Sequence, residues 1–111
     1  MKTNNNIIKT PKRYYSNAEK CKFLMYKENK NKSGIYRWTN LITKESYIGK
    51  SFNIRSRLYN YFSIKHLKTI LYKRNNYIYN ALLTYGHSNF SFEILEYAKE
   101  NKLKYKEKRY I

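Results

Sequence analysis

Two tyrosines and two glycines mark the ends of one short stretch, residues 34–49, and they are the first candidates for chemistry. Tyr36 lies two residues after Gly34, and Tyr47 lies two residues before Gly49. The chain has only 3 glycines, and glycine is favoured where a side chain would obstruct a backbone or a ligand. A phenol can act as a general base where positive neighbours favour loss of its proton. The stretch therefore predicts a polar site in which two phenols stand beside bare backbone.

Arg57, Tyr61 and Lys50 follow this stretch and could join the same site. Arg57 and Tyr61 are four residues apart, so on a helix they project from one shared face. A guanidinium carries a permanent charge and a fixed fork of donors, which suits a phosphate oxygen. Lys50 could lower a tyrosine pKa or hold phosphate. The alternative for each residue alone is a sheet aromatic or a surface cation in a basic protein.

The elements that must position these residues begin with a β-hairpin. Two runs of β-branched and aromatic residues flank a polar segment, Asn40–Glu45, that is rich in turn formers. Side chains alternate along a strand. If Ile35 and Ile48 face the core, Tyr36 and Tyr47 emerge together on the other face.

The rest of the chain predicts helices and one more strand. Either Ser51 or Asn53 should cap the N-terminus of the helix that carries Arg57. His66 and His87 have no metal-ligand spacing and are expected on the surface. Before the hairpin we expect a flexible basic arm over 1–15 and a helix that starts at a capping box, Ser16–Glu19, and ends in a linker over 29–33. After the hairpin we expect a helix that buries Ile54, Leu58 and Phe62, and then two helical pieces over 66–74 and 76–85 followed by Gly86. A third strand around Phe90–Leu95 should lie beside the hairpin, and a last helix should run from about Glu100 to the end.

Charge is the strongest property of the whole chain. Its 111 residues carry 24 Lys plus Arg against 7 Asp plus Glu, a formal net charge of +17. So many positive charges repel one another in a compact fold, and the usual partner of such a protein is a polyanion. With 14 Tyr interleaved among the cations, nucleic acid is favoured over a membrane. The single Cys21 excludes an internal disulfide and a multi-cysteine zinc site. The alternative to these functions is a basic structural protein.

Two tripeptides at hairpin spacing give the chain a family resemblance. Gly34-Ile35-Tyr36 and Tyr47-Ile48-Gly49, with the residues that follow them, resemble the catalytic domain of the GIY-YIG nucleases. The resemblance spans 33–111 and leaves a basic N-terminal arm and helix, 1–32, outside it. It implies an α/β (α+β) fold with a small three-stranded antiparallel sheet flanked by helices. The further matching segments are Lys50-Ser51, Asn53-Ile54, Arg57, Tyr61 and Phe92-Glu93-Ile94-Leu95-Glu96.

The same resemblance implies a DNA endonuclease that hydrolyses phosphodiester bonds with one Mg²⁺ or Mn²⁺ ion. One of Tyr36 and Tyr47 would act as general base while the other orients water or phosphate. The metal ligand would be Glu107, in the family's Glu-x-x-Tyr-Ile-like setting at Glu107–Ile111. The rival carboxylates are Glu93, Glu96 and Glu100, of which the first two are expected to be strand-end or solvated residues.

Intron-encoded homing endonucleases are the nearest members, and they carry a C-terminal DNA-recognition domain that is not found after residue 111. The C-terminal end is therefore expected to be truncated, or the module to need a partner. The alternative function is a non-catalytic nucleic-acid-binding remnant of the same fold. The abundance of Lys, Asn, Ile, Tyr and Phe, which have A/T-rich codons, points to an intracellular protein of organellar, mitochondrial origin.

Overall fold

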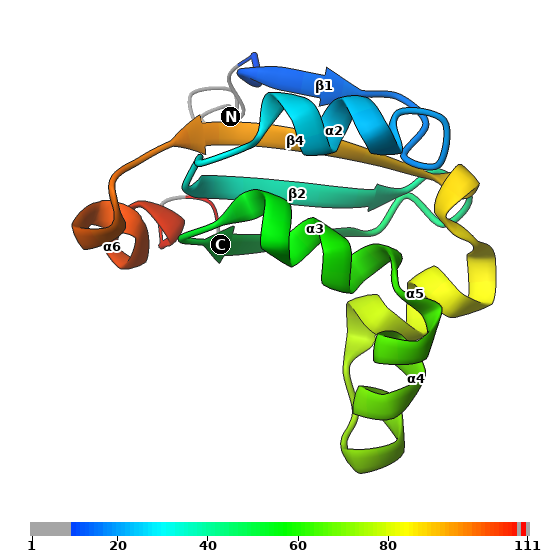
Figure 1. The fold of residues 1–111 in the computed structure, drawn as a ribbon. Coiled ribbons are helices and arrows are strands. Elements are labelled where there is room, and N and C mark those ends of the chain that lie inside the picture. Colours follow the sequence, from blue (N-terminus) through cyan, green and yellow to red (C-terminus); the bar gives the residue numbers. More distant parts are fainter. Residues whose placement is uncertain (1–9, 109, 111) are drawn as a thin grey trace, which may run out of the picture.

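A four-stranded antiparallel sheet lies at the centre of the fold (Figure 1). The computed structural model describes residues 10–108 and 110. The strands run in the order β1-β4-β2-β3, so the predicted third strand, β4, does lie beside the hairpin. The α+β class is confirmed, but the expected three-stranded sheet is wrong by one strand. The strands are β1 (Arg13–Tyr15), β2 (Gly34–Asn40), β3 (Ser46–Ser51) and β4 (Phe90–Tyr97).

Five α-helices surround this sheet within the described residues. Polar side chains cap three of them, because Asn53, Ser63 and Asn76 each accept a hydrogen bond from a backbone N–H at the start of a helix. The predicted break between the two middle helices is confirmed, and Gly86 follows with a φ of 84°. The helices are α2 (Lys22–Glu28), α3 (Ile54–Phe62), α4 (Ile64–Lys73), α5 (Tyr77–Tyr85) and α6 (Leu103–Glu107), with short 3₁₀ turns at His87–Asn89 and Glu100–Lys102.

The hairpin of β2 and β3 forms as predicted. Tyr36 pairs directly with Gly49 across the ladder. Asn40 shapes the loop, since its Oδ1 accepts hydrogen bonds from the backbone N–H groups of Ile42 and Thr43 at 2.9 and 3.1 Å. The turn chemistry is therefore local, which is why the sequence pattern was sufficient to predict it.

The main core lies on the Tyr36 face of the sheet, which α2 and α3 cover (Figure 1). Tyr36 and Trp38 are 2% and 0% exposed, and Tyr47 is half-buried on the same face. The prediction that Tyr36 and Tyr47 share a face is confirmed, but the assignment of the core to the Ile35 and Ile48 face is wrong. Ile35 is buried on the opposite side, whereas Tyr36 is itself a core residue.

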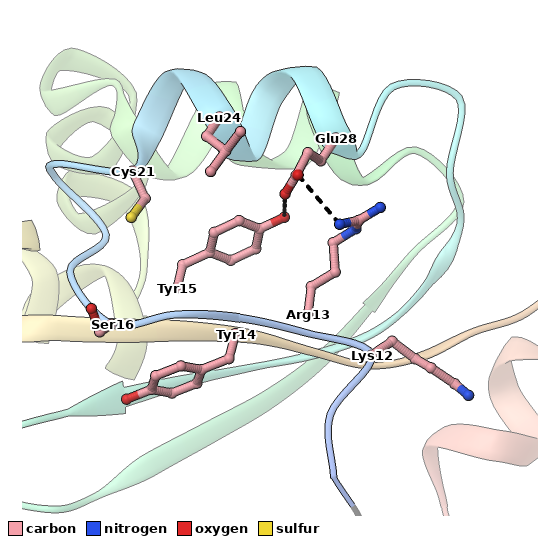
Figure 2. A pocket seen from close by; sticks show the side chains of 8 residues that line it. All are labelled: Lys12, Arg13, Tyr14, Tyr15, Ser16, Cys21, Leu24 and Glu28. Atoms are coloured by element: carbon pink, nitrogen blue, oxygen red, sulfur yellow. Dashed lines mark hydrogen bonds and ion pairs between the residues drawn. The ribbon is translucent and has the colours of Figure 1, made fainter.

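The N-terminal segment is part of the same sheet. Residues 1–9 of the expected arm lie outside the described residues, but Arg13–Tyr15 pair with β4, so the arm prediction is wrong for this part. The Tyr15 hydroxyl donates to Glu28 of α2 at 2.8 Å, and Arg13 forms an ion pair with the same carboxylate at 3.3 Å (Figure 2). These contacts close one end of a solvent-open hollow of about 410 Å³ between β1 and α2. Burial of Tyr15 and Met25 then fixes the segment to the core.

One helix boundary and one buried stripe differ from the prediction. The first helix begins at Lys22 rather than near Ser16, because Asn17 closes a turn by accepting from the Lys20 N–H at 3.1 Å before the helix starts. In α3 it is Tyr61, at 0% exposure, that completes the buried stripe, while Phe62 is half-buried.

The C-terminal helix is shorter than expected. A 3₁₀ turn precedes α6, which ends at Glu107. Arg109 and Ile111, also expected in this helix, lie outside the described residues. None of the helices in the described part of the chain is both long and apolar enough to cross a membrane.

Candidate active site

Tyr36 of β2 and Tyr61 of α3 meet in the core directly under the hairpin. Their hydroxyl oxygens are 2.7 Å apart, which is a hydrogen bond, and their rings pack edge to face with centroids 5.8 Å apart. The sequence brings them together because the alternation of β2 and the helical period of α3 both direct these side chains into one layer. Two of the predicted site residues are thus in direct contact.

Gly49 makes room for Tyr36. A Cβ built on Gly49 would lie 2.6 Å from both Cζ and the hydroxyl oxygen of Tyr36. The buried ring has no space to retreat, so only glycine fits there without a shift. Gly34 has a different role: a Cβ there would collide with the backbone carbonyl oxygen of Glu96 on β4. Both predicted glycine positions are therefore explained by close approach.

Arg57 extends the pair of tyrosines toward solvent. Its guanidinium carbon lies 4.7 Å from the centroid of the Tyr61 ring, so the predicted shared face of the two residues is confirmed. Its Nη1 also donates to the hydroxyl of Tyr79 at 2.8 Å. Burial alone would lower the pKa of Arg57, but Tyr61 and Tyr36 outweigh it and raise that pKa. The site therefore holds a permanently charged, half-buried guanidinium.

Tyr79, which the sequence did not single out, belongs to this arrangement, and His66 lies beside it. Tyr79 of α5 is 3% exposed, and its hydroxyl lies 3.4 Å from Nε2 of His66 on α4. His66 is half-buried rather than on the open surface. We call Tyr36, Tyr61, Arg57 and Tyr79 the tyrosine–arginine cluster. Its fourth member is 22 residues from Arg57, and no local spacing marks it.

His87 was expected on the surface, and this prediction is wrong. It is 7% exposed, and its Nε2 donates to the backbone carbonyl of Tyr61 at 2.7 Å. Its ring stacks on Phe62 with centroids 4.8 Å apart. His87 therefore holds the end of α3 and the Tyr61 backbone in place rather than meeting solvent.

Burial makes the phenols of Tyr36 and Tyr61 harder to ionise, because it raises the pKa of each. Burial raises the pKa of Tyr36 to about 12, although the nearby charge of Arg57 and the hydrogen bond to Tyr61 act in the opposite direction. Burial also raises the pKa of Tyr61, and Tyr36 adds to that rise. Tyr47 lies close enough to raise both pKa values further. Because Tyr47 is half-buried, it is the phenol of the hairpin that solvent reaches more easily.

Lys50 and Glu107 form a second group at the end of β3. The Lys50 Nζ lies 3.2 Å from the Glu107 Oε1. The ladder pairs Lys50 with Ile35, so its side chain starts on the face of the sheet opposite Tyr36. The structure thus brings these two predicted residues together, and α6 carries the carboxylate to β3.

Two of the rival carboxylates, Glu93 and Glu96, have other partners. Glu93 was expected at a strand end or in solvent, but it is 7% exposed in mid-strand and pairs with Arg37 at 2.7 Å, so that prediction is wrong. Glu96 is held by Lys106 and by the hydroxyl of Tyr110. Glu100 is exposed in the 3₁₀ turn before α6.

A metal ion would find few protein ligands here. Among residues 10–108 and 110, no three His, Cys, Asp or Glu side chains gather into a metal-binding group. One carboxylate fits Mg²⁺ only in the arrangement in which the ion keeps several waters and shares a substrate phosphate. Glu107 is one such carboxylate, and it is paired with Lys50.

The cluster can therefore bind an anionic oxygen next to phenol groups, whereas Lys50 and Glu107 form a separate pair, and Lys50 starts on the other face of the sheet. Comparison of the chain with models of protein families, with curated proteins and with solved structures finds no match.

Proposed function

We propose that the chain is a DNA endonuclease of the GIY-YIG type, which hydrolyses phosphodiester bonds with the help of Mg²⁺ or Mn²⁺. One observation carries the proposal: the second glycine of the motif pair is the residue that leaves space for the first tyrosine. Gly49 sits against the Tyr36 phenol, and that phenol bonds to Tyr61 at 2.7 Å. This packing supports the proposal because it gives residues of both tripeptides a role in the same site.

Arg57 would neutralise the charge that develops on the phosphorus centre. Its guanidinium is fixed between the Tyr61 ring and the Tyr79 hydroxyl, so it needs little reorganisation when a phosphate arrives. A charged group that is already held in position commonly stabilises the transition state by roughly 3 kcal/mol. Lys50 starts on the opposite face of the sheet, so it would have to leave Glu107 and reach around the β3 edge to add a second cation at that phosphate.

The chemistry requires that a water attacks phosphorus, that the bond to the 3′ oxygen breaks, and that a base takes the water's proton. Two phenols are available for the base. Tyr47 is already half-exposed. Tyr36 would first have to break its hydrogen bond to Tyr61, and its pKa of about 12 makes loss of its proton harder. A Tyr→Phe change at each position separates these assignments, since only loss of the base removes the rise of rate with pH.

Glu107 would hold the metal ion as its single protein ligand. When bound, the ion supplies charge neutralisation at the phosphate and lowers the pKa of its water. The Lys50 contact keeps the carboxylate occupied in the absence of that ion. The proposal therefore predicts a metal requirement with modest affinity.

The test is nicking of a supercoiled plasmid by the purified protein across a Mg²⁺ and a Mn²⁺ titration. The proposal expects open-circle product that requires the ion and stops when EDTA is added. Tight DNA binding with no cleavage at any metal concentration would favour the second candidate, a non-catalytic DNA-binding protein. The observation in favour of that candidate is the occupied state of Glu107, paired with Lys50.

A further inference from the structure

Helix α4 presents a polar, basic face to solvent. It projects from the sheet at the lower right of Figure 1, next to α5. Its apolar residues Leu67, Ile70 and Leu71 turn toward the core. The exposed positions recur at three- and four-residue intervals, which places them on one side of the helix. This face, which we call the α4 stripe, consists of Lys65, Lys68, Thr69, Tyr72 and Lys73, all exposed.

The α4 stripe has no acidic neighbour along the chain. No Asp or Glu occurs between Glu45 and Glu93, and the three lysines of the stripe are in none of the ion pairs formed by the described carboxylates. Arg74 continues the positive charge at the C-terminal end of the helix. Uncompensated cations along one line favour a polyanion that also extends along a line.

The shape of the stripe distinguishes among polyanions. A protruding α-helix is convex and about 10–12 Å across, which matches a DNA major groove about 12 Å wide. Single strands are held instead in concave grooves lined by aromatic side chains. A membrane surface would need an exposed apolar face, but the apolar face of α4 is directed into the core.

The stripe is also connected to the candidate site. His66, at the base of α4, lies 3.4 Å from the Tyr79 hydroxyl, and Tyr79 accepts a hydrogen bond from Arg57. Two side-chain contacts therefore link α4 to Arg57. Tyr72, 93% exposed, adds an aromatic ring near the other end of α4.

We propose that α4 is a DNA-binding element that enters the major groove of duplex DNA and contacts its phosphates through Lys65, Lys68 and Lys73, with Tyr72 against the sugar–phosphate backbone. This inference rests on the proposed function for its choice of DNA. The stripe supplies affinity and orientation without sequence selection, and the tyrosine–arginine cluster remains the site of chemistry.

The test compares two triple variants with the same loss of charge. Lys65→Gln, Lys68→Gln and Lys73→Gln together remove the stripe. Their control combines Lys20→Gln, Lys27→Gln and Lys30→Gln, which are exposed positions in and around α2. Each set includes one lysine from the last turn of its helix, Lys73 or Lys27, so the effect on helix stability is matched. Binding to a duplex is measured in EDTA over a range of salt, which separates it from any cleavage.

Neutralisation of the stripe should reduce the slope of log affinity against log salt by up to about 2.7, since each phosphate contact contributes about 0.9. Affinity at fixed low salt should fall about tenfold or more, while the control should stay within about twofold of the wild type. Equal losses in the two triple variants would overturn the proposal, because binding would then depend only on total charge. A loss confined to single-stranded DNA or to RNA of the same length would overturn the choice of duplex.

Tyr72 provides a second, independent measurement. Tyr72→Ala should weaken duplex binding several-fold, whereas Tyr105→Ala, at a position 70% exposed on α6, should not. Both residues are on the surface, so neither change is expected to affect folding. Unchanged binding by Tyr72→Ala would remove Tyr72 from the proposal. If the plasmid is never nicked, these binding results still stand, so the two proposals can fail separately.

Discussion

Gly49 lies directly across the β2–β3 ladder from Tyr36, and a Cβ at Gly49 would lie 2.6 Å from the Tyr36 hydroxyl oxygen. One residue of the second tripeptide thus sets the position of a phenol from the first. The Tyr36 hydroxyl in turn bonds to Tyr61, whose ring faces Arg57. A disturbance at Gly49 should therefore pass to the whole tyrosine–arginine cluster.

Gly49→Ala should destabilise the fold by about 1–3 kcal/mol, because an overpacked core has to shift a buried ring. The same change in a Tyr36→Ala background should cost much less, since the clashing ring is gone. Urea unfolding of the four proteins gives the coupling energy between the two positions. Equal costs in both backgrounds would show that Tyr36 is not the obstacle.

Tyr79→Phe should slow plasmid nicking about tenfold at saturating DNA while leaving the DNA affinity unchanged. The reason is that the hydroxyl of Tyr79 fixes Arg57 but does not itself contact the substrate. Tyr77→Phe is the matched control, since Tyr77 is on the same helix and its hydroxyl bonds to Glu45 instead. A change in affinity with no change in maximal rate would contradict a positioning role.

Lys50→Met should tighten Mn²⁺ binding several-fold in the absence of DNA, because it releases the Glu107 carboxylate and removes a repelling cation. Glu107→Gln should abolish that binding. Because the pair is partly exposed, neither change should alter the free energy of unfolding by more than about 1 kcal/mol. Calorimetric titration with Mn²⁺ measures the effect.

Lys104→Met controls for charge alone in that experiment, since Lys104 is exposed on the helix that carries Glu107 and is in none of the ion pairs of the described carboxylates. If it tightened Mn²⁺ binding as much as Lys50→Met does, the ion would be responding to net charge and Glu107 would not be its ligand.

Alkaline pH should destabilise the fold through Tyr36. Below about pH 10 the phenol is protonated in both the folded and the unfolded chain, so its contribution is fully present. Between about pH 10 and a folded pKa of about 12, only the unfolded chain loses the proton, and the free energy of unfolding falls. Tyr36→Phe should therefore show a shallower fall over this range, measured by urea unfolding at several pH values. The same slope in Tyr36→Phe as in wild type would contradict this, and Tyr72→Phe serves as the control with an exposed phenol.

The hairpin and the helices after it could be predicted because their causes are local. Asn53 and Asn76 cap helices within their own first turns, and Asn40 shapes its own loop. The shared face of Arg57 and Tyr61 follows from helical spacing alone. The prediction of these elements does not depend on contacts with distant parts of the chain.

The errors concern residues whose environment is set by distant parts of the chain. Strand β1 is short and basic, and it is a strand only because β4 offers its edge. Glu93 is buried because Arg37 lies opposite it on β2, and His87 is buried because a carbonyl of α3 accepts its hydrogen bond. Tyr79 was missed for the same reason, since its link to Arg57 joins two helices. Spacing along the sequence does not predict the burial of a polar residue whose partner is far away in the chain.

The most direct test of the account is the single-turnover nicking rate of Arg57→Ala against that of Arg55→Ala. Both changes remove one cation from α3, but Arg55 lies over Tyr59, away from the cluster. We predict that Arg57→Ala loses at least about a hundredfold in rate, as expected for a positioned transition-state contact, and keeps its DNA affinity, while Arg55→Ala nicks like the wild type. Wild-type nicking by Arg57→Ala, or equal losses in both variants, would contradict the assignment of the active site.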